Sequence, residues 1–159
     1  APTDLIVGNS TLNSINHKYI PEIVYSAMDL GLRSIAFSWY TPFSNNDPLW
    51  VNYKERNKDI DLIIKLKEKY PNFIANEVEE LEMMRNPKWT NECPNWAVIS
   101  IDAYGNVKRP CVFGENAICE KCGCHVFPSL LLSIKKLKKG MLANYARLKW
   151  KGLLLGAVV

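Results

Sequence analysis

Long apolar runs are absent from this sequence: no stretch reaches the roughly 18 residues that a membrane-spanning helix needs. The chain is not poor in apolar residues either, because 48% of its 159 residues are hydrophobic and only 23% are charged. This composition excludes an intrinsically disordered chain. The length suits one domain with a sizeable core, or an incomplete domain joined to a small module.

Acidic residues are missing from the last part of the chain. From Val126 to the end there are seven Lys or Arg and no Asp or Glu, whereas residues 1–125 carry 13 basic and 16 acidic residues. Apolar residues recur in this tail at steps of three or four, which indicates an amphipathic helix. They are Leu130, Ile134, Leu137, Met141, Tyr145 and Leu148. We expect a helix over residues 128–159, with Ser129 as its N-cap and Gly140 as its weak point.

A basic amphipathic helix of this kind either packs on its own domain with a solvated basic face or lies on an anionic membrane. Nucleic acid is not an expected partner, because Tyr145 and Trp150 are the tail's only residues able to stack on bases. Ala1-Pro2-Thr3-Asp4 contains neither an initiator Met nor a basic signal-peptide region, as in a processed or truncated chain. We expect a cytoplasmic protein, with peripheral membrane contact as the alternative.

The first half of the chain alternates between strand and helix patterns. Unbroken apolar runs at 5–7, 34–37 and 73–75 predict buried parallel strands. Helical spacing predicts a helix from Ile20 to Leu30, closed by Gly31, and another through Ile60 to Leu66 that ends before Tyr70-Pro71. A further short helix is expected from Val78 to Met84. The order β-α-β-α-β predicts a partial parallel (β/α) barrel of three βα units over residues 1–84.

Ligands of such α/β folds bind at the carboxyl ends of the strands. Asn9, Ser10 and Asn13 follow the first predicted strand, and Ser38 follows the second. They are therefore candidate binding residues, although polar residues are also ordinary in turns. His17 is expected to be a surface residue, and Asp59 and Asp61 are expected on the exposed face of their helix, so none of the three is assigned a role.

Five cysteines follow, with the spacing C-x17-C-x7-C-x2-C-x-C: Cys93, Cys111, Cys119, Cys122 and Cys124. Their odd number and the missing signal peptide disfavour a disulfide framework. Structural zinc is one reading, because Cys119-x2-Cys122 is half of a zinc knuckle and His125 offers a nitrogen ligand. An iron–sulfur cluster is the other, and buried apolar thiols are the plain alternative.

A hairpin is expected to bring two of these thiols together. Residues 96–102 resemble a strand, Gly105 lies in a turn, and a second run starts at Val107. Cys93 precedes the first arm and Cys111 follows the second, so both thiols reach the same end of the ribbon. Residues 85–127 are thus expected to form a small cysteine-rich module between the partial barrel and the helical tail.

The segment from Cys93 through Ile101-Asp102 and Gly105 to Pro110-Cys111 resembles the opening half of a SPASM-type auxiliary cluster domain. Such domains follow the catalytic barrel in many radical S-adenosylmethionine enzymes, and the preceding β-α-β-α-β order is similar to the second half of that barrel. The resemblance implies that Cys93, Cys111, Cys119 and Cys122 ligate an auxiliary [4Fe-4S] cluster, with Cys124 as a spare or replacement ligand. It also implies that Asn9, Ser10, Asn13 and Ser38 face S-adenosylmethionine or the substrate.

Two departures from the family pattern limit these implications. The C-x3-C-x2-C loop that binds the catalytic cluster is absent, so the chain alone is not expected to generate a radical. S-adenosylmethionine binding would need a companion chain that supplies the other half of the barrel. The loop after Gly105 is one residue longer than usual and the later SPASM cysteines are missing, which favours a single auxiliary cluster. The alternative from another class is a zinc-stabilised interaction module whose basic tail binds lipid or nucleic acid.

Overall fold

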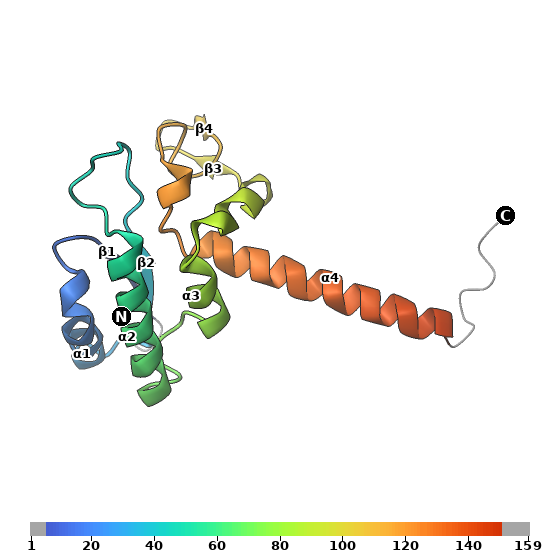
Figure 1. Cartoon of the computed structure of the whole chain (residues 1–159), viewed down its shortest axis with the longest axis horizontal. Helices are drawn as coiled ribbons and strands as arrows, with labels where there is room; N and C mark the ends of the chain where they lie inside the picture. The colour runs from blue at the N-terminus through green and yellow to red at the C-terminus, as the bar shows by residue number, and fades with distance from the viewer. Residues whose placement is uncertain (1–5, 151–159) are drawn as a thin grey trace.

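A computed structural model describes residues 6–150 of the chain, and side chains as far as Met141. Its main elements are β1 (Val7–Leu12), α1 (Ile20–Asp29), β2 (Ser34–Trp39), α2 (Tyr53–Lys69), α3 (Val78–Met84), the hairpin β3 (Ser100–Ile101) and β4 (Val107–Lys108), and α4 (Val126–Trp150). Short 3-10 turns at 87–92, 95–97 and 119–121 lie between α3 and α4. Figure 1 shows the helices α1 to α3 gathered on one side and α4 projecting away from them.

The sheet at the centre is small and parallel. β1 pairs with β2 in register from Val7–Ser34 to Leu12–Trp39, and α1 forms the crossover between them. The third predicted strand contributes only an isolated bridge between Ile35 and Ile74. Beyond that bridge, the side chain of Asn76 takes the place of a strand backbone, accepting from the Phe37 N–H (2.6 Å) and donating to the Phe37 carbonyl (3.0 Å). The fold is therefore α/β, and the described residues form no closed barrel.

The first strand is longer than the sequence indicated, and it begins later in the chain. It was expected over residues 5–7 with polar residues beyond its end, yet it continues from Val7 through Asn9 and Ser10 to Leu12. Successive side chains of a strand point to opposite faces, so polar and apolar positions can share it. Asn9 and Thr11 are exposed on one face, while Leu12 is buried on the other.

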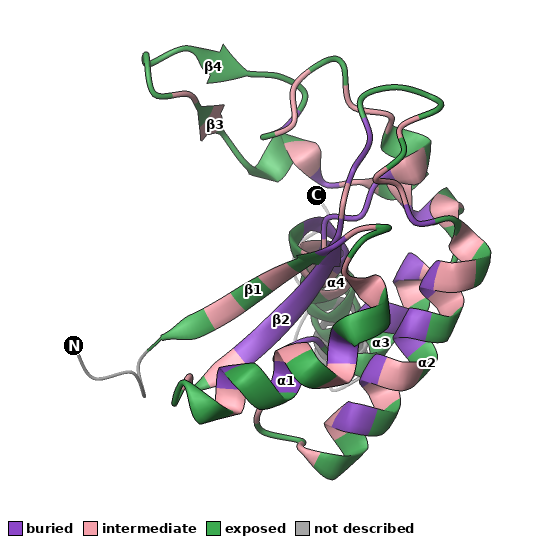
Figure 2. Cartoon of the chain, turned by 90° about the vertical axis from the view of Figure 1, so that its left-hand side faces the viewer, coloured by how far each residue is buried: buried purple, intermediate pink, exposed green. Residues whose placement is uncertain are grey.

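The three predicted helices of this half are confirmed. α1 ends at Asp29 and Gly31 follows with a φ of 72°, the left-handed conformation expected at a C-cap. α2 begins after Asn52, whose side chain accepts from the Glu55 N–H at 3.1 Å, and ends before Tyr70-Pro71. Purple segments in Figure 2 mark where β2 and the helices bury one core. Its largest buried members include Leu12, Phe37, Trp39, Ile20, Ile60, Ile63 and Leu81.

The hairpin is shorter than expected. It pairs only Ser100 with Lys108 and Ile101 with Val107, and the expected first arm at 96–102 instead begins in a 3-10 turn. Trp96 and Ile99 are 77% and 78% exposed, so no core supports a longer ribbon there.

Helix α4 begins at Val126, two residues before the expected start. Pro128 fits in its first turn, where a backbone N–H has no helical partner in any case. Ser129 is consequently inside the helix, its N–H bonded to the His125 carbonyl at 3.2 Å, and not the N-cap. The side chains of Tyr145 and Leu148, and residues 151–159, lie outside the described residues. No helix between residues 6 and 150 is both long and apolar enough to cross a membrane.

Candidate metal centre

Four of the five thiols line one small, largely enclosed cavity, called here the thiol cavity. Cys93, Cys111, Cys119 and Cys122 contribute to its wall, and its volume is about 60 Å³. Cys111 and Cys122 are buried, Cys93 is half-buried and Cys119 is exposed. These are the four positions for which the sequence resemblance implied a ligand role.

The four thiols reach the cavity from three irregular segments. Cys93 ends the 3-10 turn after α3, and Cys111 follows β4. Cys119 begins the 3-10 turn at 119–121, and Cys122 caps it, with its N–H bonded to the Cys119 carbonyl at 2.9 Å. The hairpin, though short, brings Cys93 and Cys111 to the same end, as the sequence predicted.

The thiols stand in an apolar setting. Trp89 and Phe127 pack with Cys111, Cys122 and Cys124 in one buried cluster. Burial raises the pKa of Cys93 to about 11 and that of Cys122 to about 12, and it also raises the pKa of Cys124. Among the described residues, the hydrogen bonds that lower the pKa of these thiols are outweighed by burial, so a bound cation would be the group that ionises them.

The cavity is larger than the space of about 10–15 Å³ that a single water needs. Across the described part of the chain, no three His, Cys, Asp or Glu side chains come close enough together to hold a single metal ion. Trp89 also lines the cavity, and its indole N–H is buried without a hydrogen-bond partner. Thiolate ligands together with a free donor fit a sulfide-containing cluster.

Comparison with known proteins finds no match among protein families, curated proteins or solved structures.

Gly123 fixes the cysteine loop to the end of β2. Its carbonyl accepts from the Trp39 N–H at 2.8 Å, and its own N–H donates to the Thr41 hydroxyl at 3.0 Å. The backbones approach so closely that a Cβ on Gly123 would overlap the Trp39 carbonyl. Thr41 also donates toward the Cys122 sulfur at 3.8 Å. The thiol cavity is thus held directly against the carboxyl end of the sheet.

A second cavity, the strand-end cavity, opens beside the first and has a volume of about 270 Å³. Thr41 and Phe113 line both cavities and so form the wall between them. Cys124 lines the strand-end cavity and is absent from the lining of the thiol cavity. The fifth cysteine thus faces the strand-end cavity, although it packs in the same buried cluster as Cys111 and Cys122.

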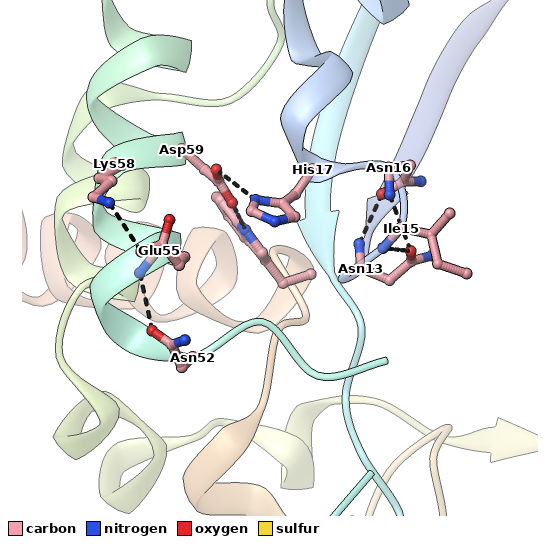
Figure 3. Close-up of polar contacts among 9 residues, drawn as sticks. Asn13, Ile15, Asn16, His17, Asn52, Glu55, Lys58 and Asp59 are labelled. Carbon is pink, nitrogen blue, oxygen red and sulfur yellow. Dashed lines mark hydrogen bonds and ion pairs between the residues drawn. The ribbon is translucent and has the colours of Figure 1, made fainter. Parts of the chain in front are cut away.

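Two of the four predicted binding residues line the strand-end cavity. Asn9 and Ser38 do so, and Thr11, whose hydroxyl is 3.3 Å from that of Ser38, joins them. Ser10 is on the opposite face of β1. Asn13 is used locally, because its side chain accepts from the backbone N–H of Ile15 at 2.9 Å (Figure 3). Ser10 and Asn13 do not line the cavity.

The sequence did not predict a contact between a histidine and a buried glutamate at this cavity. His125 lines it, and its Nδ1 is 3.2 Å from an oxygen of the buried Glu80. The same Glu80 oxygen accepts from Asn76 at 2.9 Å. From the sequence, His125 was expected only as a possible zinc ligand next to the cysteines. Its pairing with Glu80, 45 positions away, leaves no local signal in the sequence.

The burial of Asp59 shows that another prediction was wrong. This residue is buried, not on the exposed face of α2, with one oxygen 3.1 Å from His17 Nδ1 and the other accepting from the Trp39 indole at 3.1 Å (Figure 3). Burial raises the pKa of Asp59 against the lowering effects of His17 and Trp39. The role of this pair is to fix Trp39, on which the cysteine loop docks.

Proposed function

We propose that this chain is the C-terminal part of a radical S-adenosylmethionine enzyme and binds an auxiliary [4Fe-4S] cluster. The observation that carries the proposal is the meeting of four thiols from three segments around one cavity. Cys93, Cys111, Cys119 and Cys122 are the ligands. Bound there by four thiolates, such a cluster would supply one-electron transfer, because each of its irons would already carry a cysteine ligand.

The residues around the cluster have separate tasks. Trp89 offers its free indole N–H, and Thr41 its hydroxyl, to sulfur atoms of the site, and such donors tune a cluster's potential. Phe127 and Phe113 limit the access of water. On the other side of the wall, Asn9, Ser38 and His125 offer polar groups to S-adenosylmethionine or the substrate in the strand-end cavity.

The chain works with a companion that supplies the catalytic cluster and the other half of the barrel. In support, β2 is the only strand partner of β1 among the described residues, and Val7 at its start is 56% exposed. A parallel edge strand with exposed side chains is suited to pairing with a further strand. Without such a companion the chain generates no radical, because it lacks the C-x3-C-x2-C loop.

Anaerobic reconstitution of the 159-residue chain with iron and sulfide tests the cluster. We expect a brown protein with thiolate-to-iron charge-transfer absorption and equal amounts of bound iron and sulfide. Cys119→Ser and Cys122→Ser should lose most of this iron, because each removes a thiol from the cavity wall. Cys124→Ser is the matched control, since Cys124 lines the other cavity, and it should retain the iron. A colourless protein holding one zinc would instead support the zinc-stabilised module.

A second proposal concerns helix α4, which we infer to contact an anionic membrane surface. The helix projects from the body (Figure 1), and every residue from Lys135 to Met141 is exposed, including Leu137 and Met141. Lys135 and Lys136 form ion pairs with Glu92 and Glu79, whereas Lys138 and Lys139 have none with the described residues. Free lysines beside exposed apolar side chains are suited to anionic headgroups.

Reversing the charge of Lys138 and Lys139 to Glu should lower binding to phosphatidylserine vesicles by about thirtyfold or more, because each lost lysine near the surface contributes roughly 1 kcal/mol. Sedimentation with vesicles measures this. The matched control reverses Lys54 and Lys65, which are exposed on α2, and should bind as the unmodified chain does. Equal losses in both double variants would point to net charge alone and contradict a surface on α4.

A further inference from the structure

Arg56 is an arginine wholly inside the protein, next to the thiol cavity. It lies on α2 with no exposed surface. One terminal nitrogen donates to the Cys122 carbonyl at 2.9 Å, and the other to the Lys121 carbonyl at 3.4 Å. Its guanidinium also faces the rings of Tyr53 and Trp39, at 4.8 and 5.6 Å from their centroids. The positive charge therefore rests against the backbone of a proposed cluster ligand.

This charge is only partly compensated, because burial lowers the pKa of Arg56 and the nearby Asp59 carboxylate raises it without forming an ion pair. No carboxylate of the described residues forms an ion pair with Arg56. Asp59, one turn further along α2, is engaged with His17 and Trp39. The Nε–H of Arg56 is buried without any partner. A buried charge without compensation is costly, and carbonyl dipoles and aromatic faces offset only part of that cost.

We propose that Arg56 is the counter-charge of the thiolate-ligated cluster and raises its reduction potential. The inference rests on the proposed function. A cluster held by Cys93, Cys111, Cys119 and Cys122 has net negative charge, and it becomes more negative when it accepts an electron from a reductant. A fixed cation at Cys122 stabilises that reduced form in a poorly solvated site. No proton moves in this step, because guanidinium stays protonated.

A purely structural role is the competing explanation, since Arg56 also clamps the loop through two carbonyls. Two substitutions separate the roles. Arg56→Lys keeps the charge but loses the fork of donors, whereas Arg56→Gln keeps a donor for a carbonyl but loses the charge. Arg85→Gln is the control, because Arg85 pairs with Glu82 and Asp61 on a separate surface.

The experiment titrates the reconstituted 159-residue chain with dithionite in the presence of mediators and follows the reduced cluster by electron paramagnetic resonance. We expect Arg56→Gln to shift the reduction equilibrium about tenfold toward the oxidised cluster, which is about 59 mV for one electron. Arg56→Lys should stay close to the unmodified protein, and Arg85→Gln should match it. A cluster retained by Arg56→Lys but lost from Arg56→Gln would also support the proposal, because charge alone would then decide assembly.

Three results would overturn it. An unchanged potential in Arg56→Gln would remove the role of the charge. Equal shifts, or equal loss of the cluster, in Arg56→Lys and Arg56→Gln would show that the carbonyl contacts matter and the charge does not. An unmodified chain that binds no iron would overturn the proposed function together with this inference, and it is recognised before any variant is titrated.

Discussion

Replacing Gly123 with Ala should detach the cysteine loop from the sheet and abolish iron binding by the chain. The added Cβ would overlap the Trp39 carbonyl, and that atom cannot retreat because it belongs to the backbone of β2. Overpacking against backbone costs about 3 kcal/mol, and the bond from the Trp39 N–H to the Gly123 carbonyl would be lost with it. Urea unfolding and iron content after reconstitution measure the two effects.

The matched control is Gly140→Ala. A Cβ at Gly140 meets no atom within 4 Å, and Ala favours a helix by about 0.5–1 kcal/mol over Gly. This variant should therefore bind iron normally and unfold no more readily than the original chain. If Gly123→Ala kept both its iron and its unfolding midpoint, the close docking of the loop on β2 would be wrong.

Asn76→Ala should lower the free energy of unfolding by about 3 kcal/mol. It is the second of the two largest effects that we expect. The Asn76 side chain, 1% exposed, joins the Phe37 N–H, the Phe37 carbonyl and Glu80. Its removal leaves buried polar groups of β2 without partners, and each costs about 1–3 kcal/mol. Urea denaturation followed by circular dichroism gives the value.

Asn91→Ala is the control for this variant, because Asn91 is exposed. Its unfolding free energy should change by less than about 0.5 kcal/mol. Equal stabilities of the two variants would mean that the edge of β2 does not depend on the Asn76 side chain.

The helices were predictable because their signals are local. Gly31 after α1 and Tyr70-Pro71 after α2 mark ends that the structure keeps, and α3 has the predicted bounds. Helical periodicity and caps act within a few residues, so they are visible in the sequence. The start of α4 was wrong by two residues because Pro128, taken as a boundary, is tolerated in a first turn.

Strand lengths were not predictable, since they depend on partners distant in the sequence. Ile74 forms one bridge and no strand because the Asn76 side chain occupies the next backbone positions of β2. β1 continues through Asn9 and Ser10 because β2 pairs with it along its whole length. Neither outcome leaves a local pattern.

The thiols of the candidate site could be found from their spacing, but the groups around them could not. Cysteine spacing and the hairpin predicted the meeting of Cys93 and Cys111. Arg56 and Asp59 occupy an ordinary charged helix in the sequence, and only the packing of Trp39 and the cysteine loop buries them. Charge in a sequence predicts exposure, so buried charges are missed by that rule.

Helix α4 starts directly after the cysteine loop, with only His125 between Cys124 and Val126. Its 25 residues make a rod of about 37 Å at 1.5 Å per residue. A rigid helix of this length converts a small rotation at its start, beside the loop that carries the thiols, into a large displacement of its far end. A rotation of about 10° at Val126 would therefore displace the far end by roughly 6 Å on this length.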